Sequence, residues 1–164
     1  MHTIFFDYMD ARTHTSTLLV EIEAPLELVW DCLTKEISKW WRTDFYTSEK
    51  TQKFILEPRL GGMMYEDFGN GGGLVWANVI GLDPPHYLEL KGHLSASFGG
   101  PAVSFLHIRL ENKGAKKTFF HFSDSIIGPI SEEGRDNTLE GWRLLWAEGL
   151  KPYVEKKQAA VKAE

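Results

Sequence analysis

The sequence predicts an α+β domain in which a curved antiparallel sheet of about seven strands wraps around a long C-terminal helix. Seven segments show the two-residue alternation or the short apolar runs of strands, and Gly, Pro and Asp turns separate the last six. Two short helical patterns follow the first strand, and one long helical pattern closes the chain. Because every element has an apolar face, the sheet and the long helix must cover each other.

The first strand is predicted over residues 15–23, TSTLLVEIE, where apolar residues alternate with polar ones on one face. Pro25 ends this strand and suits the first turn of a helix. Residues 26–34 then form a short amphipathic helix, because apolar side chains recur at spacings of three and four. A second short helical piece is predicted over residues 36–41.

The middle of the chain predicts a meander of six strands joined by short turns. The glycine run at 69–73 fits a hairpin turn that needs positive φ. It does not fit a phosphate-binding loop, because a strand follows it and the Lys-Ser/Thr pair is missing. The six strands are expected at residues 52–58, 61–68, 74–82, 86–94, 102–111 and 116–125.

The last element is a long helix that begins at Ser131 and repeats apolar residues at helical spacing as far as Val154. Three glycines within it cost about 1 kcal/mol each relative to Ala, so packing must hold the helix. Pro152 is expected to kink or end it. We expect an N-terminal extension at 1–14, one domain over 15–155, and a fraying tail at 156–164.

Composition excludes several classes of protein. The 164 residues contain one cysteine and carry a formal net charge of -5, which argues against an intrachain disulfide, a four-cysteine zinc site and a nucleic-acid partner. No apolar run approaches the length of a membrane span, and the N-terminus lacks the features of a signal peptide. We therefore expect a soluble cytoplasmic monomer or homodimer with no cofactor.

An ordered set of motifs carries a resemblance to a known family: APLELVWDCLT, KWW, EPRLGGMMYE, WANVIGLDPPHYLEL and EGWRLLWAEGLKPYVE. This set resembles the START-like, or SRPBCC, helix-grip superfamily over Thr15 to Glu155. Within it, the set is most similar to proteins like the activator of the heat shock protein 90 ATPase. The resemblance implies a cavity between the sheet and the C-terminal helix, in which members mostly bind apolar or aromatic small molecules.

Some members of this superfamily are cyclases or aromatases, and others assist a chaperone. The co-chaperone has an additional N-terminal domain that supplies much of its chaperone contact, whereas about 14 residues precede the first strand here. The resemblance therefore does not by itself imply that this chain activates a chaperone.

Aromatic residues make up 13% of the sequence, and they are the first candidates for a ligand site. Rigid side chains that rise from a curved sheet and a helix can leave a void for an apolar ligand, or they can simply fill the core. We expect the two tryptophans of the long helix to touch any ligand. The candidate set is Trp40, Trp41, Phe54, Met63, Tyr65, Trp76, Phe105, Phe120, Trp142 and Trp146.

Arg59 completes the candidate ligand-binding set. It lies two residues after Glu57 in the segment EPRLGG, so an ion pair between them that fixes the strand crossing is one interpretation. The other is that Arg59 binds a ligand carboxylate at the mouth of the cavity. Arg109, in a strand otherwise rich in apolar residues, has the same two interpretations.

The polar residues predict neither a metal site nor a catalytic group. His107 and His121 pair across the last hairpin if it closes symmetrically, but their spacing with Asp124 or Asp67 matches no known metal signature. Cys32 has apolar neighbours and fits a small buried side chain. Nucleophile-elbow and zinc-protease motifs are missing. A further set of polar residues could converge in a cavity, although nothing in their spacing requires it: Tyr65, Glu66, Asp67, His93 and Ser95.

Three functions remain open at this point. A module that binds a small apolar or amphipathic molecule predicts a closed cavity lined by aromatic residues. A chaperone-linked interaction protein predicts a filled cavity and an exposed apolar patch. An enzyme of the cyclase or hydrolase kind predicts at least two polar residues with shifted pKa values in one cavity.

Overall fold

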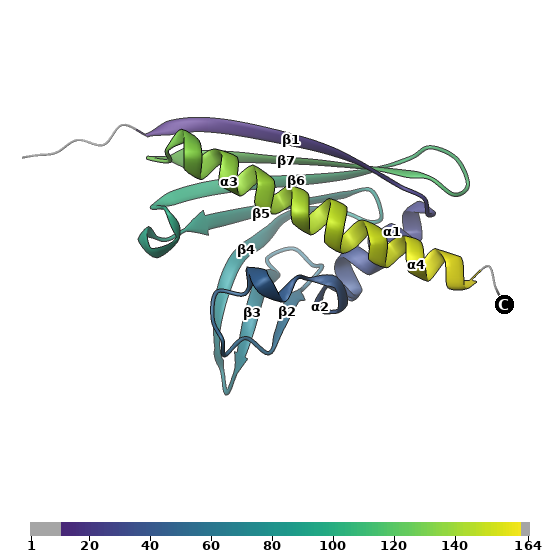
Figure 1. Ribbon diagram of the computed structural model, residues 1–164, viewed down its shortest axis with the longest axis horizontal. Helices are drawn as coiled ribbons and strands as arrows, with labels where there is room; N and C mark the ends of the chain where they lie inside the picture. The colour runs from purple at the N-terminus through teal and green to yellow at the C-terminus, as the bar shows by residue number, and fades with distance from the viewer. Residues whose placement is uncertain (1–10, 162–164) are drawn as a thin grey trace, which may run out of the picture.

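The computed structural model describes residues 11–161 and contains one seven-stranded sheet and one long C-terminal helix (Figure 1). Short 3₁₀ turns occur at Thr43–Phe45 (η1) and Ala96–Phe98 (η2). The strands and helices are β1 (Arg12–Ile22), α1 (Leu26–Lys35), α2 (Ile37–Trp40), β2 (Lys53–Leu56), β3 (Met63–Gly69), β4 (Gly72–Asp83), β5 (Tyr87–Leu94), β6 (Ala102–Asn112), β7 (Thr118–Gly128), α3 (Glu132–Arg143), η3 (Leu144–Leu150) and α4 (Lys151–Val161).

The sheet has the order β1-β7-β6-β5-β4-β3-β2, and each neighbouring pair is antiparallel. Six strands follow one another as a meander, and β1 returns to pair with β7, so that Val20 lies opposite Phe120. Figure 1 shows β2 and β3 curled away from β1 and the long helix lying across the sheet. The predicted fold class, a curved antiparallel sheet wrapped around a C-terminal helix, is confirmed.

Side chains alternate between a concave face that meets the helix and an outer face. Along β6, Leu106, Ile108 and Leu110 are buried, and along β7 Phe120 and Phe122 are buried. These residues recur at every second position, which is the spacing that places side chains on one face of a strand. The concave face therefore supplies the sheet's half of the core.

The long helix runs from α3 through the π-helical segment η3 into α4. It begins at Ser131, whose Oγ accepts a 3.0 Å hydrogen bond from the backbone N–H of Gly134. At the end of η3, the N–H of Lys151 bonds to the carbonyl of Trp146, five residues earlier. Pro152 follows directly and does not end the helix, because the wider π turn relieves the clash between its ring and the preceding turn.

Regular secondary structure extends into both predicted terminal segments. Strand β1 begins at Arg12, before the expected boundary at residue 15, and α4 continues to Val161, through much of the expected tail. Glu36 holds this last helix, because it accepts hydrogen bonds from Tyr153 (2.7 Å) and Lys157 (2.6 Å). The bonds from Lys157 and then Tyr153 lower the pKa of Glu36 to about 2.

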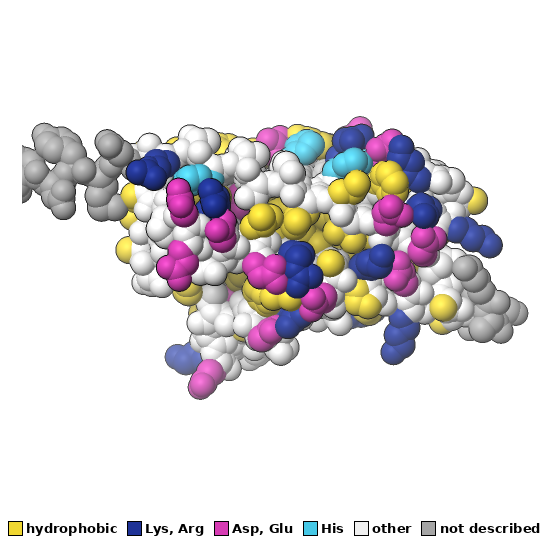
Figure 2. Space-filling model, turned by 45° about the horizontal axis from the view of Figure 1, so that its top comes forward, with side chains coloured by type: hydrophobic (Ala, Val, Ile, Leu, Met, Phe, Trp, Pro, Cys, Tyr) yellow, Lys and Arg dark blue, Asp and Glu magenta, His cyan; other side chains and the backbone are white. Residues whose placement is uncertain are grey.

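Charge on the surface is mixed. Figure 2 shows acidic and basic side chains interspersed over the displayed face, with apolar side chains exposed between them. The long helix contributes to this pattern through ion pairs such as Arg143 with Glu140 at 2.8 Å. Within residues 11–161, no helix is both long and apolar enough to cross a membrane.

Candidate functional site

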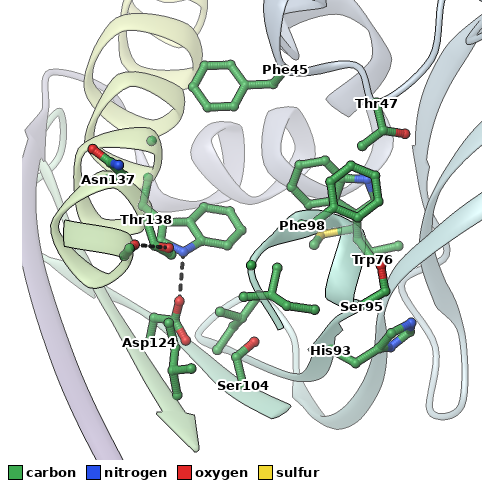
Figure 3. Close-up of a pocket in the computed structure, with 18 of the residues that line it drawn as sticks. Phe45, Thr47, Trp76, His93, Ser95, Phe98, Ser104, Asp124, Asn137 and Thr138 are labelled. Carbon is green, nitrogen blue, oxygen red and sulfur yellow. Dashed lines mark hydrogen bonds between the residues drawn. The ribbon is translucent and has the colours of Figure 1, made fainter. Parts of the chain in front are cut away.

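A pocket of about 480 Å³ lies between the concave face of strands β3 to β7 and the first half of the long helix. This volume lies within the range of about 300–1,000 Å³ that is typical of small-molecule sites. Figure 3 shows polar side chains reaching it from both the sheet and the helix. Most of the lining is apolar; the residues are Phe45, Thr47, Met64, Leu74, Val75, Trp76, His93, Leu94, Ser95, Phe98, Gly99, Ser104, Leu106, Asp124, Ile126, Gly134, Asn137, Thr138, Gly141, Trp142 and Leu145.

Small residues on both walls leave this space open. On the sheet, Ser104 lines the pocket, and its partner on the neighbouring strand, Gly92, has no side chain. On the helix, Gly134, Thr138 and Gly141 follow at spacings of four and three, so they share the face that lines the pocket. Because cores are otherwise closely packed, a hollow remains where both facing surfaces lack bulk.

A β-bulge directs Trp76 to the pocket. The pairing of β3 with β4 shifts between Met64 and Tyr65, and Trp76 is the extra residue on β4. A bulge changes which face a side chain points to. Trp76 therefore reaches the concave face, where Ala77 and Val79 are buried, and does not share a face with Asn78 as simple alternation predicts.

A buried carboxylate fixes the wall behind Trp76. Glu66 is fully buried and accepts a 2.8 Å hydrogen bond from the Trp76 Nε1. It also accepts bonds from the backbone N–H of Thr47, at 3.0 and 3.1 Å, and from the hydroxyl of Thr51. Burying a carboxylate without such donors would be costly, so these bonds tie the loop after η1 to the sheet.

The helix side of the pocket ends on stacked indoles. Trp142 and Trp146 are one turn apart, with ring centroids 5.5 Å apart and an interplanar angle of 4°. Trp142 lines the pocket, whereas Trp146 lies deeper and packs against Phe120 and Phe122. Trp142 therefore forms the boundary between the pocket and the solid core.

Asp124 is a buried carboxyl group in the pocket wall and is 2% exposed. Its Oδ2 accepts a 2.9 Å hydrogen bond from the Trp142 Nε1, drawn in Figure 3. Within residues 11–161, its Oδ1 has no hydrogen-bond partner. Burial raises the pKa of Asp124 to about 6, although the bond from Trp142 acts in the opposite direction.

Two loops form the rim. Phe45 comes from η1 and lies on the helix side in Figure 3, while Phe98, Ser95 and His93 lie on the sheet side. Phe98 belongs to the short turn η2 and is 47% exposed. Large aromatic side chains at the rim can cover a bound molecule without filling the interior.

The family follows from the sequence match, once the fold and this pocket are known. Residues 23–155 match the family model described as "Activator of Hsp90 ATPase homolog 1-like protein". The chain belongs to this family. Among curated proteins, none matches the sequence.

Solved structures share the fold of this family member at low sequence identity. CalU16 from Micromonospora echinospora has a TM-score of 0.61 and 17% identity, covering 87% of this chain and 74% of that one. An uncharacterised protein from Rhizobium leguminosarum has a TM-score of 0.57 and 16% identity, covering 90% of this chain and 99% of that one. Norcoclaurine synthase from Thalictrum flavum, in complex with dopamine and hydroxybenzaldehyde, has a TM-score of 0.56 and 11% identity. The match covers 98% of this chain and 97% of that one. Each likeness establishes the architecture alone.

Two of the eleven side chains predicted to bind a ligand, Trp76 and Trp142, line the pocket. Trp41 stacks on Phe54 with ring centroids 3.7 Å apart, and the Nε1 of Trp40 donates to the carbonyl of Cys32 at 2.8 Å. These contacts match the alternative that aromatic side chains fill the core. The five candidates that lie in the buried core are Trp40, Trp41, Phe54, Phe120 and Trp146.

The remaining four candidates point away from the pocket. Met63, Tyr65 and Phe105 alternate with buried strand neighbours, so their side chains occupy the outer face of the sheet. Arg59 lies in the turn before β3, where its exposed guanidinium pairs with Glu57 at 2.9 Å. The structure therefore places Arg59 in the ion pair and not at the mouth of the pocket.

Sequence reasoning missed the pocket's most unusual residue. Asp124 was considered as a metal ligand, but its position in the strand carries a clearer signal. It follows Phe120 and Phe122 at the two-residue spacing of one face, so an acidic side chain interrupts an apolar series. An acid on an otherwise buried face predicts either a buried pair or a functional site. Ser104 and Thr138, by contrast, carry no comparable signal.

The histidines of the last hairpin do not pair directly. His107 lies opposite Ser123, and His121 lies opposite Arg109, because the pairing is offset by two residues from symmetry about Gly114. His121 instead contacts Glu111 at 3.1 Å. Across the described part of the chain, no group of three or more His, Cys, Asp or Glu side chains could hold a metal ion.

Proposed function

We propose that this protein binds a small apolar or amphipathic molecule in the pocket between the sheet and α3. One observation carries the proposal: a space of about 480 Å³ with a mainly apolar lining, inside an interface that is otherwise packed with aromatic side chains. Burying apolar ligand surface there contributes about 25 cal/mol per Å². We also propose that it acts in the cytoplasm, which agrees with its single free thiol at Cys32.

The polar groups of the pocket support an amphipathic ligand. Asp124 and Ser104 lie on adjacent strands at the base of the pocket, and Thr138 faces it from the helix. Small-molecule sites typically combine an apolar lining with a few polar groups that fix orientation. Norcoclaurine synthase, which has the same architecture, has been solved with two small aromatic molecules bound.

Native mass spectrometry of protein purified from its own host tests this proposal. We expect a bound molecule that leaves on denaturation, with a mass of a few hundred daltons, as suits a pocket of this size. The matched control is Thr138→Leu, because a larger side chain at this helix position occupies the pocket. Recovery of wild-type protein with no bound molecule, together with no binding of any aliphatic or aromatic probe by calorimetry, would rule the proposal out.

A second candidate function is stimulation of a chaperone ATPase, and the family match is the observation that favours it. It needs a protein partner and not the pocket. The direct assay adds the purified protein to the chaperone of the same host and follows ATP hydrolysis. If the rate is unchanged at saturating protein, this candidate is excluded and ligand binding stands alone.

A further inference from the structure

One buried oxygen atom in the pocket lacks the partner that burial normally demands. Asp124 is 2% exposed, and in the part of the chain that the structure describes its Oδ1 accepts no hydrogen bond. The other carboxylate oxygen is held by Trp142, so rotation of the group is restricted. Nearly all buried polar groups are paired, so an unpaired one in a pocket wall suggests a missing ligand.

The surroundings of Asp124 provide little positive charge. Two titratable side chains lie near Asp124. His93 shares its pocket and is exposed at the rim, and His14 of β1 has a buried Nε2 that is itself unpaired within residues 11–161. No lysine or arginine is among the pocket-lining residues. The side chains that face Asp124 or share its pocket are His14 and Ser16 of β1, His93 of β5, Ser104 and Leu106 of β6, and Thr138 and Trp142 of α3.

We propose that the pocket takes a compact aromatic or aliphatic amine whose ammonium group binds the Oδ1 of Asp124. The proposal rests on the proposed function and names the chemical class of its ligand. An ammonium group supplies both a hydrogen-bond donor and the charge that a buried carboxylate lacks. A neutral hydroxyl supplies only the donor, and a ligand carboxylate supplies a repelling charge.

The apolar part of such an amine has a place in the same pocket. Trp142 and Trp76 present aromatic surface, and Leu74 and Leu106 add aliphatic surface. The Nε1 groups of both indoles are already engaged by carboxylates, so their rings remain available for apolar contact.

Three probes of nearly equal shape separate the contribution of charge from that of apolar burial. They are naphthylmethylamine, naphthylmethanol and naphthoate, substituted at the same ring carbon, and binding is measured by calorimetry at about pH 7.5, where the carboxyl group is ionised. We expect the amine to bind at least about tenfold more tightly than the alcohol, as one charge-assisted hydrogen bond allows. Naphthoate should bind most weakly.

The variant Asp124→Asn assigns this preference to one residue. It keeps the shape of the side chain and an oxygen that can accept from the Trp142 Nε1, but it removes the charge. We expect amine affinity to fall about tenfold or more while alcohol affinity changes by about twofold or less. Ser104→Ala is the matched control, because it alters a neighbouring pocket residue but leaves the charge of Asp124 in place. It should change the affinities for the amine and the alcohol by the same factor.

The pH profile of the wild-type protein gives a readout that needs no variant. Amine affinity should decrease as the pH falls below about 6, where Asp124 becomes protonated, whereas alcohol affinity should stay level. His14 and His93 are the other titratable side chains near Asp124, so His14→Gln and His93→Gln are measured in parallel and should retain the dependence on pH.

The outcomes separate the two proposals. Equal affinities for amine and alcohol, or equal losses of both in Asp124→Asn, would refute the amine as ligand class and leave the binding pocket intact. Failure of all three probes, together with no co-purified molecule, would instead remove the proposed function itself. If Asp124→Asn does not fold, a flat wild-type pH profile for the amine is sufficient to overturn the inference.

Discussion

The long helix meets the sheet in two regions that are built differently. Around Trp146, Leu150 and Val154, each at most 2% exposed, the interface is solid. Around Gly134, Thr138 and Gly141, the same helix faces a pocket of about 480 Å³. We call these the filled region and the hollow region.

The difference between the two regions is one of side-chain volume on both surfaces. The filled region pairs tryptophans with large sheet residues: Trp146 of the helix packs on Phe120, and Trp41, directly after α2, stacks on Phe54. The hollow region pairs small helix residues with Ser104, whose partner on the neighbouring strand is Gly92. The fold provides the curved interface, and the local sequence decides whether it is packed or empty.

Truncating an aromatic side chain should cost far more in the filled region, and this is the largest effect that we expect. Phe120 is fully buried and packs against Trp146, so Phe120→Ala should lower the free energy of unfolding by about 3–5 kcal/mol. The matched change in the hollow region, Phe98→Ala, should cost less than about 1 kcal/mol, because Phe98 is 47% exposed. Urea unfolding of both variants measures the difference. Equal losses would show that the two regions do not differ in packing.

Removing the carboxylate that fixes the pocket wall behind Trp76 should have the next largest effect. Glu66 accepts hydrogen bonds from Thr47, Thr51 and Trp76, and Gln in its place has one acceptor oxygen and adds a competing donor. We expect Glu66→Gln to cost about 1–3 kcal/mol of unfolding free energy. The emission of Trp76 should also shift, because its indole N–H then competes with Thr47 and Thr51 for a single acceptor oxygen.

A matched control for that variant is an exposed glutamate outside the sheet. Glu49→Gln, in the exposed loop before β2, changes the same functional group and should alter the free energy of unfolding by no more than about 0.5 kcal/mol. A Glu66→Gln variant as stable as the Glu49→Gln control would contradict the role given to Glu66.

The fold was predictable because it follows from local patterns. Each element is specified by its own residues, without knowledge of its neighbours in space. The patterns are alternation in β1 and β7, glycine turns between strands, and helical spacing after Ser131. The boundaries were less accurate. The end of α4 depends on Lys157 meeting Glu36, which lies 121 residues away and is not visible in any local pattern.

The pocket was harder to predict because it depends on what is missing from two facing surfaces. Trp41, Phe54 and Phe120 are conspicuous in the sequence, yet they fill the core, whereas the hollow lies between Ser104 and small residues of the helix. Pairing those positions requires the register and the path of the helix. To predict that Trp76 lines the pocket, one must also know of the bulge that directs its side chain inward.

The buried charge of the hollow region should reduce stability above its pKa. The pKa of Asp124 rises from 3.8 to about 6 on folding, so the folded protein binds more protons than the unfolded chain between these values. Stability therefore falls as the pH rises through this window. Asp124→Asn removes the penalty and should be more stable than wild type by about 1–3 kcal/mol at about pH 7.5, and no more stable below pH 4.

Comparing variant and wild type at each pH cancels the titration of groups that both share. Urea unfolding at a series of pH values therefore isolates Asp124. A difference that does not change with pH would mean that the carboxyl group titrates alike in the folded and unfolded states. A stabilised variant that has lost amine binding would show that the hollow region keeps its charge for function, at the expense of stability.

The smallest effect on stability, with a large effect on binding, should come from converting the hollow region into a filled one. Thr138→Leu adds apolar volume on the helix face of the pocket and improves helix propensity, but it loses the 2.8 Å bond from the threonine hydroxyl to the Gly134 carbonyl. These terms oppose each other, so the free energy of unfolding should change by less than about 1 kcal/mol. Naphthylmethanol affinity should fall about tenfold or more, because the side chain and the ligand compete for the same space.

The position of the added leucine decides whether this result concerns the pocket. Glu133→Leu places the same side chain on an exposed position in the first turn of α3, outside the residues that line the pocket, and should leave probe affinity unchanged. If both variants reduce binding equally, the loss reflects a general change in the helix. If Thr138→Leu binds like wild type, the ligand does not use the space beside Thr138, and the hollow region is not its site.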